Sequence, residues 1–228
     1  MRRLIFTDVH ANEPAFRAIL EDVGQFDEAL FLGDIVGWGP HPRECTALLQ
    51  EMGAVRVLGN HDHSCCADRN GWLWDQWTYD QLTDDMRAWI LDCPFCVQIP
   101  SGKSELFCIH KAPASASYLR PSISPKEMAD AFGCQDADLL LCGHCHHGIE
   151  RVWNNKRYAC IRAVGQMRDG DPQTGYTIEE NGRLTHYRVP YDTEKVIYDL
   201  KTIGLESAFL ERWSSFIRTA YDSEWSRL

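Results

Sequence analysis

Five short apolar runs recur along the chain, and each is followed by a polar side chain that can bind a metal ion. The runs span residues 4–6, 29–32, 55–58, 106–109 and 139–142, and their length is typical of buried β-strands. The polar residues that follow them are Asp8, His10, Asp34, Asn60, His110, His144 and His146. Ligands of open α/β sheets bind beyond the carboxyl ends of the strands, so this recurrence predicts a metal site.

The segments between the first runs have the periodicity of helices. Asn12 is a candidate helix cap before Pro14, and residues 42–52 form a second predicted helix that ends at Gly53. Residues 1–62 therefore predict a β-α-β-α-β unit, whose parallel sheet we expect to bring the ligands side by side. Residues 149–162 and 174–189 predict hairpins, the second turning at Asn181-Gly182. Parallel units followed by hairpins favour two sheets packed face to face, with helices outside.

We expect a single domain over residues 1–228, because no linker, internal repeat or low-complexity tract divides the chain. Residues 64–92 are rich in tryptophan and predict a helical excursion near the site, with a helix cap at Thr83. Two interpretations of Trp72, Trp74 and their aromatic neighbours stay open: they fill a core beside the sheet, or they form a lid that stacks on substrate. Residues 193–228 predict a C-terminal amphipathic helical segment.

Composition excludes several classes of protein. The formal net charge is −10 and no basic cluster stands out, which argues against a nucleic acid polymer as partner. No run approaches the roughly 18 apolar residues of a membrane span, and no signal-peptide apolar region follows Met1. We therefore expect a cytoplasmic protein without membrane contact. Most of the ten cysteines are predicted to be small buried apolar groups, not disulfides.

The seven candidate ligands offer only nitrogen and oxygen donors, which suit two ions that share a carboxylate. Mixed imidazole and carboxylate donors favour divalent Mn, Fe, Zn, Ni or Co over Mg or Ca, and we expect Mn to serve in an assay. Asp8 and His10 are two residues apart, as are His144 and His146, so extended chain would direct each pair to one side. Two ions roughly 3.5–4 Å apart can bind a phosphoryl group and supply a hydroxide for in-line attack. His61 is not needed as a ligand and can protonate the leaving oxygen.

The motifs of residues 8–146 resemble, in the same order, those of the calcineurin-like metallophosphoesterases. They are Asp8-Val9-His10, Gly33-Asp34, Gly59-Asn60-His61-Asp62, His110 and Gly143-His144-Cys145-His146. The resemblance implies an α/β fold, a four-layer α/β/β/α sandwich of two mixed sheets with flanking helices. It also implies a dinuclear phosphoesterase that hydrolyses a small phosphomonoester or phosphodiester.

The resemblance further implies a role for each motif residue. The first metal would be bound by Asp8, His10 and His146, and the second by Asn60, His110 and His144. Asp34 would bridge the two ions. His61 would be the general acid, and Asp62 would orient it.

The similarity extends to a bacterial-type subgroup of small phosphoesterases through residues 33–40, Gly-Asp-Ile-Val-Gly-Trp-Gly-Pro, and residues 165–172, Gly-Gln-Met-Arg-Asp-Gly-Asp-Pro. The chain departs from that subgroup at Lys111, where glycine is usual, and at residues 160–163, where Asn-Pro-Gly-Ser is usual. Lys111 and Arg168 are the candidate contacts to a phosphorylated substrate. The alternative interpretation of both is ordinary surface charge.

Three other functions fit parts of the sequence less well. Ser/Thr protein phosphatases share Gly-Asn-His but have Asp-Arg-Gly where this chain has Gly37-Trp38-Gly39. A catalytically silent scaffold of the same fold would commonly lack a ligand or the acid histidine, and none is missing here. A thiol oxidoreductase would use Cys142-Gly-His-Cys145, but a predicted hairpin follows this motif where a helix is needed.

Overall fold

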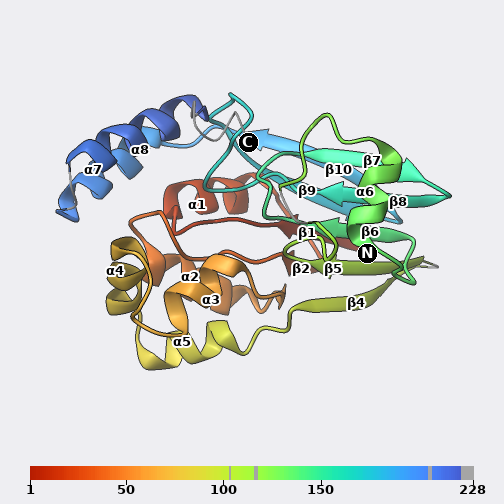
Figure 1. The fold of residues 1–228 in the computed structure, drawn as a ribbon, viewed down its shortest axis with the longest axis horizontal. Coiled ribbons are helices and arrows are strands. Elements are labelled where there is room, and N and C mark those ends of the chain that lie inside the picture. The colour runs from red at the N-terminus through yellow and green to blue at the C-terminus, as the bar shows by residue number, and fades with distance from the viewer. Residues whose placement is uncertain (103, 116–117, 205–206, 222–228) are drawn as a thin grey trace.

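The computed structural model describes residues 1–102, 104–115, 118–204 and 207–221, which form two five-stranded mixed sheets and eight helices (Figure 1). The first sheet has the order β10-β9-β1-β2-β3. Its strands are β1 (Arg2–Phe6), β2 (Glu28–Phe31), β3 (Val55–Arg56), β9 (Thr174–Glu180) and β10 (Arg183–Val189). Strands β1, β2 and β3 are parallel, and the β9–β10 hairpin adds to β1 antiparallel.

The second sheet has the order β4-β5-β6-β8-β7. Its strands are β4 (Cys96–Ser101), β5 (Ser104–Ile109), β6 (Leu139–Cys142), β7 (Ile149–Trp153) and β8 (Lys156–Cys160). Strands β5, β6 and β8 are parallel, whereas β4 and β7 pair antiparallel at the two edges. The predicted fold class, an α/β fold of two mixed sheets with flanking helices, is confirmed.

The helices cover the outer faces of the two sheets. They are α1 (Glu13–Asp22), α2 (Pro42–Met52), α3 (Asn60–Cys66), α4 (Leu73–Gln81), α5 (Asp84–Leu91), α6 (Pro125–Phe132), α7 (Thr193–Thr202) and α8 (Ser207–Thr219). The Asn12 side chain caps α1 by accepting from Ala15 N–H, and Thr83 caps α5 in the same way from Met86 N–H, as predicted. Among the described residues, no helix combines the length and the hydropathy that a membrane span requires.

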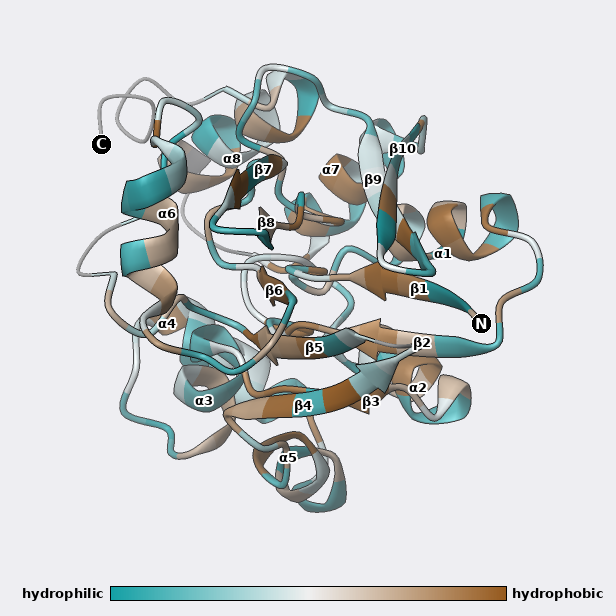
Figure 2. Cartoon of the chain, turned by 90° about the vertical axis from the view of Figure 1, so that its right-hand side faces the viewer, coloured by the Kyte–Doolittle hydropathy of each residue, from teal (hydrophilic) through white to brown (hydrophobic). Residues whose placement is uncertain are grey.

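Three apolar layers follow from this arrangement. Ile5, Leu30 and Leu141 belong to a buried cluster contributed by both sheets, and brown hydrophobic stretches mark β1, β2, β5 and β6 in Figure 2. A second cluster joins the outer face of the first sheet to α1, α2 and α5, and a third joins the second sheet to α6. Burial of these apolar surfaces is the main term that holds the two sheets together.

Four details differ from the predictions. The five ligand-bearing strands do not share one sheet: β1, β2 and β3 lie in the first and β5 and β6 in the second. Strand β3 is only two residues long and half-buried, and β4 was not predicted. The C-terminal segment contains two helices, α7 and α8, which pack on each other (Figure 1). Residues 222–228 of that prediction lie outside the described residues.

The tryptophans of residues 64–92 do not form one cluster. Trp74 is only 6% exposed and packs with α7 and α8, while Trp72 is 81% exposed. Trp89 lies instead under the guanidinium of Arg56 and against the core beside the first sheet. A core role therefore holds for Trp74 and Trp89. All ten cysteines are free thiols and eight are buried, as expected of small apolar groups.

Candidate metal centre

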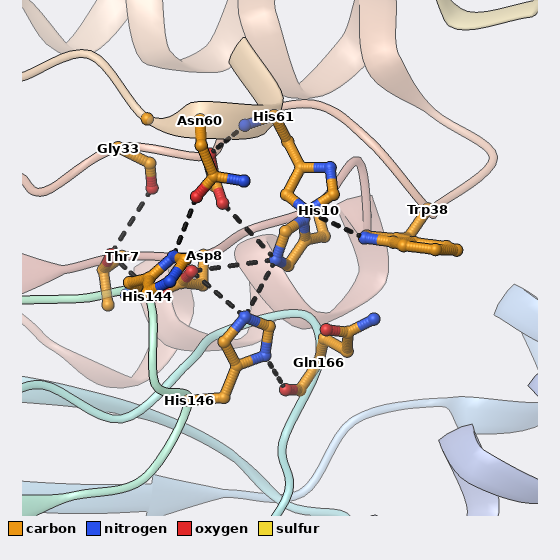
Figure 3. Close-up of polar contacts among 12 residues, drawn as sticks. Thr7, Asp8, His10, Gly33, Trp38, Asn60, His61, His144, His146 and Gln166 are labelled. Atoms are coloured by element: carbon orange, nitrogen blue, oxygen red, sulfur yellow. Dashed lines mark hydrogen bonds and ion pairs between the residues drawn. The ribbon is translucent and has the colours of Figure 1, made fainter. Parts of the chain in front are cut away.

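The candidate ligands converge from loops at the ends of strands of both sheets. Asp8 and His10 follow β1, Asp34 follows β2, and His110 follows β5. Figure 3 shows the side chains of Asp8, His10, Asn60, His144 and His146 turned toward one another. The convergence was predicted, but it arises from strand ends in both sheets, not from one sheet alone.

An unusual backbone conformation directs these side chains. Asp8, His10, Asp34, His144 and His146 all have left-handed φ values, between 47° and 68°. The prediction that extended chain directs each ligand pair to one side is therefore wrong. Residues with a Cβ seldom adopt this region, and such strain gathers at functional sites.

The motif glycines are required by close packing around the ligands. A Cβ on Gly59 would lie 2.1 Å from Asp34 Oδ1. A Cβ on Gly143 would lie 2.1 Å from Thr7 Oγ1 and 2.8 Å from Asp8 Oδ2. Only glycine lets these loops approach the carboxylates so closely.

One set of donors is Asp8, His10 and His146, which we call the buried group. Their exposed fractions are 0%, 1% and 2%. His146 Nε2 lies 3.2 Å from both Asp8 Oδ1 and His10 Nε2. These three residues could hold a metal ion together.

The other set is Asn60, His110 and His144, which we call the open group because Asn60 is exposed and His144 is half-buried. Asn60 Oδ1 lies 3.0 Å from His110 Nε2 and 2.8 Å from His144 Nδ1. Asp34 Oδ2 lies 3.2 Å from His110 Nε2 and 3.9 Å from His10 Nε2. Asp34 thus lies between the two groups, where a bridging carboxylate is expected.

The donors fit metal ions because their lone pairs face one another. The Nδ1 atoms of His10, His110 and His146 lie against the carbonyl oxygens of Val36, Leu32 and Gln166. A carbonyl oxygen can only accept, so each Nδ1 carries the proton and a neutral ring leaves its Nε2 lone pair in the site. Asp8 Oδ1 and Asp34 Oδ2 are buried without a hydrogen-bond donor among the described residues. A cation would satisfy all of these acceptors.

The protonation states of His10 and His146 agree with that arrangement, whereas His110 would reach it only when a metal displaces its second proton. Burial lowers the pKa of both His10 and His146, so both rings stay neutral, the form that binds metals. Burial would also lower the pKa of His110, but the Asp34 carboxylate overrides it and raises the pKa to about 10. Without a cation, His110 therefore holds a proton that metal binding has to displace.

Asp62 contacts other atoms than expected. Its buried carboxylate accepts hydrogen bonds from the backbone N–H groups of Asp34 (2.8 Å), Ile35 (2.8 Å) and Gly59 (3.1 Å). These bonds fix the Asp34 loop, whereas the expectation was that Asp62 orients His61. Burial and the Asp34 charge raise the pKa of Asp62 to about 7.

His61 lies next to the ligands, as predicted, but its ring partner was not foreseen. The backbone N–H of His61 donates to Asp34 Oδ1 at 2.8 Å. The imidazole ring of His61 lies edge-on to the ring of His10, with centroids 5.1 Å apart. The indole N–H of Trp38 donates to His61 Nε2 at 3.2 Å (Figure 3). The unusual sequence Gly37-Trp38-Gly39 was the feature of the chain that could have pointed to this Trp38–His61 contact.

The two candidate substrate cations differ in position. The Arg168 guanidinium donates to Gln166 Oε1 at 2.7 Å and lies 5.2 Å from the centre of the Tyr118 ring. Tyr118 stacks on His144 with centroids 4.5 Å apart, and the carbonyl oxygen of Gln166 contacts His146, so Arg168 borders the site between the open group and the buried group. Burial lowers the pKa of Arg168. Lys111 follows His110 directly and is exposed.

Three supporting residues were not predicted. Gln166 holds His146 through its carbonyl oxygen, Tyr118 stacks on His144, and Thr7 Oγ1 donates to Asp8 Oδ2 at 2.8 Å. Gln166 belongs to the motif of residues 165–172 and Thr7 directly precedes Asp8, so the sequence did mark both positions. Tyr118 lies in a loop without a recognisable motif.

Solved structures of other proteins share the architecture of this chain. A metallophosphoesterase from Sphaerobacter thermophilus is 29% identical, with a TM-score of 0.81 over 94% of this chain and 98% of its own. A hypothetical protein from Pyrococcus horikoshii is 16% identical, with a TM-score of 0.86 over 97% and 99% of the two chains.

Two sequence comparisons agree with this likeness. An uncharacterized protein of Methanocaldococcus jannaschii is 27% identical over 220 residues, which cover 84% of this chain and 88% of the relative. The family model for calcineurin-like phosphoesterases matches residues 1–148, a span that contains both ligand groups. The chain therefore belongs to the calcineurin-like phosphoesterase family.

Proposed function

We propose that this protein is a dinuclear metal-dependent phosphoesterase that hydrolyses a small phosphomonoester or phosphodiester. The observation that carries the proposal is the set of acceptor atoms that face one another across the site. The neutral rings of His10 and His146 and the buried carboxylates of Asp8 and Asp34 direct lone pairs into the site, and His110 holds a proton there that a cation would displace. Such a set is costly to bury unless cations satisfy it.

The buried group would hold one metal and the open group the other, with Asp34 shared between them. When bound, the two ions would supply Lewis acidity toward the phosphoryl oxygens and would activate water near neutral pH. The mixed imidazole and carboxylate donors favour a transition metal, and Mn²⁺ is the ion to try first.

Other side chains would act on the substrate itself. Arg168 borders the open group and could bind a phosphoryl oxygen through its guanidinium, which offers several donors. His61 would deliver a proton to the leaving oxygen as general acid. No basic cluster stands out in the sequence, which favours a small substrate over a nucleic acid polymer.

A direct test combines metal content with hydrolysis. The purified protein is stripped with a chelator, reloaded with Mn²⁺, and assayed with p-nitrophenyl phosphate and bis-p-nitrophenyl phosphate. We expect about two metal ions per chain, metal-dependent release of nitrophenolate, and a preference that separates monoesterase from diesterase activity. The variant His186→Ala serves as a control for the loss of a histidine outside the site, since His186 contacts Thr177 and Glu150. It should keep the metal content and the hydrolysis of the unchanged protein.

Two results would contradict the proposal. Failure to take up metal after reloading would mean that the ligand groups do not bind ions. Two bound ions without hydrolysis of either ester, or of a panel of small natural phosphoesters, would favour a catalytically silent scaffold.

A further inference from the structure

We propose that Tyr118 is a positioning residue for phosphate binding: its ring supports the imidazole of His144, and its phenol oxygen holds the guanidinium of Arg168. The proposal rests on the proposed function, in which Arg168 binds a phosphoryl oxygen and His144 binds a metal ion. Tyr118 would act through these two neighbours and would be neither a metal ligand nor an acid.

The face of the Tyr118 ring supports His144. The planes of the two rings are 6° apart and their centroids 4.5 Å apart, which is parallel stacking. The other three imidazoles of the site are held by backbone carbonyls through Nδ1, whereas Nδ1 of His144 lies 2.8 Å from the Asn60 side chain. Since Asn60 is exposed and His144 is half-buried, stacking on Tyr118 restricts the plane of the ligand ring.

The phenol of the same residue contacts Arg168. The guanidinium carbon lies 5.2 Å from the ring centre, and the guanidinium hydrogen-bonds the Tyr118 side chain. A guanidinium can only donate, so the phenol oxygen accepts. A second bond runs from Arg168 to Gln166 Oε1 at 2.7 Å. Two acceptors thus orient a planar group whose fork of N–H donors matches phosphoryl oxygens.

The charge of Arg168 acts on the buried group as well. It interacts electrostatically with the Asp8 carboxylate and with the His146 ring. Tyr118 links the same guanidinium to His144 of the open group. One positive charge therefore faces both ligand groups, a position that favours an anion bound between them.

A cysteine attaches the Tyr118 loop to the ligand loop. The backbone N–H of Leu119 donates to Cys145 Sγ at 3.1 Å, and Leu119 is only 4% exposed. Cys145 stands between His144 and His146 in the sequence, so its thiol connects Tyr118 directly to the ligand segment. This contact gives the motif cysteine a role that disulfide chemistry does not, since Cys145 is a free, buried thiol.

A residue that only fills space would respond differently to substitution. Tyr118 is half-buried and packs against the apolar cluster between the second sheet and α6, so its ring also contributes to packing. Phenylalanine keeps the ring and its stack on His144 but lacks the oxygen that Arg168 uses. Leucine removes both the oxygen and the stack. A packing role alone predicts that phenylalanine leaves phosphate binding unchanged.

The experiment compares wild type, Tyr118→Phe and Tyr118→Leu. Tyr176→Phe is the matched control, because the Tyr176 hydroxyl donates to Asp22 Oδ2 at 2.7 Å outside the site. Isothermal titration calorimetry gives the Kd of inorganic phosphate for the Mn²⁺-loaded protein and the Kd of the more weakly bound Mn²⁺ ion. Steady-state kinetics give kcat and KM for p-nitrophenyl phosphate.

The two substitutions should have different signatures. For Tyr118→Phe we expect the phosphate Kd and the KM to rise about tenfold, the equivalent of one net hydrogen bond, with kcat and Mn²⁺ affinity changed less than about twofold. Tyr118→Leu should raise the phosphate Kd at least as much. It should also weaken binding of the second Mn²⁺ ion about fivefold, because the stack on His144 is lost. Every value for Tyr176→Phe should stay within about twofold of wild type.

A double-mutant cycle tests the link to Arg168. In the Arg168→Met background, Tyr118→Phe should change the phosphate Kd less than about twofold, because the hydroxyl then has no guanidinium to hold. A merely structural role would give the same loss in both backgrounds.

Three results would overturn the proposal: an unchanged phosphate Kd in Tyr118→Phe, an equal loss with and without Arg168, or unchanged Mn²⁺ affinity in folded Tyr118→Leu. The first two decide even if Tyr118→Leu does not fold. If wild type binds phosphate but hydrolyses neither test ester, the proposed function fails, while the phosphate affinities still decide the role of Tyr118. If wild type does not bind phosphate, the role of Tyr118 is overturned whatever the hydrolysis assay gives.

Discussion

The buried group and the open group have similar donors but very different surroundings. Asp8, His10 and His146 are at most 2% exposed, whereas in the open group Asn60 is exposed and His144 is half-buried. His10 and His146 are fixed by backbone carbonyls through Nδ1, and so is His110, the one buried member of the open group, which is 3% exposed. The contrast therefore lies in Asn60 and in His144, which turns its Nδ1 toward Asn60 and stacks on Tyr118.

This difference predicts different exchange rates for the two ions. The buried group has no solvent-facing ligand, so its ion should be slow to exchange. The open group has the exposed ligand Asn60 and the half-buried His144, so its ion should be reached more readily from solvent. Ligand substitutions, chelation and a change of pH can each test this contrast.

Asp34→Asn should have the largest effect, because Asp34 lies between the two groups and its charge serves both. A metal ion supplies several kcal/mol of transition-state stabilisation, so we expect kcat to fall by about three orders of magnitude. Steady-state kinetics, with metal content measured in parallel, provide the test. An activity within tenfold of wild type would mean that the two groups work independently.

His146→Ala and His144→Ala should separate the two groups by stability. Each removes one ligand and should lower the metal content by about one ion per chain. His146→Ala also opens a space in a buried site and removes the bond to Gln166, which should cost about 2 kcal/mol in the metal-free protein. His144→Ala should cost less than about 1 kcal/mol, since His144 is half-buried. Urea unfolding of both variants is the measurement, and equal losses would contradict the comparison.

Chelation should remove the two ions in two phases. The exposed ligand Asn60 gives a chelator access to the open group, so about one ion per chain should leave quickly. Loss of the second ion should require opening of the buried group and should be at least about tenfold slower. Stopped-flow chelation with a metal indicator measures both phases. A single phase that accounts for two ions would show that burial does not control exchange.

The recurrence of polar residues after apolar runs predicted which side chains converge, because it reflects a simple property of α/β folds; that they bind metal stays a prediction. The motifs also included Gly59 and Gly143. The arrangement in space was harder to predict from the sequence, because nothing within the five apolar runs shows whether they form one sheet or two. Assignment to two sheets depends on long-range pairing, such as that of β8 beside β6.

The left-handed backbone conformation at the candidate ligands also could not be predicted from the local sequence. Asp and His in a polar segment after a strand are compatible with extended chain, and only the packed loops force φ to positive values. For the same reason the partner of His61 was missed. Trp38 reaches it only because residues about 170 positions later in the chain pack on the indole.

A further effect, on folding stability and its pH dependence, concerns the loop that supports the buried group. Arg162 is 7% exposed and binds both carboxylate oxygens of Asp169 at 2.8 and 2.9 Å, which clamps the ends of the loop that carries Gln166. Burial would raise the pKa of Asp169, but Arg162 lowers it below the usual value. The bond should therefore stabilise the fold above the unfolded-state pKa of about 4, and this stabilisation should disappear as pH falls through the lower folded-state pKa.

Asp169→Asn tests this clamp. The metal-free variant should lose about 1–2 kcal/mol of unfolding free energy at pH 7, and the difference from wild type should shrink below about pH 4. Asp171 lies in the same loop and contacts Arg188 at the surface, so Asp171→Asn is the control and should cost less. If Asp169→Asn also speeds release of the slow metal ion while Asp171→Asn does not, the loop contributes to the buried group's slow exchange. If neither variant changes that rate, burial of the ligands themselves accounts for it.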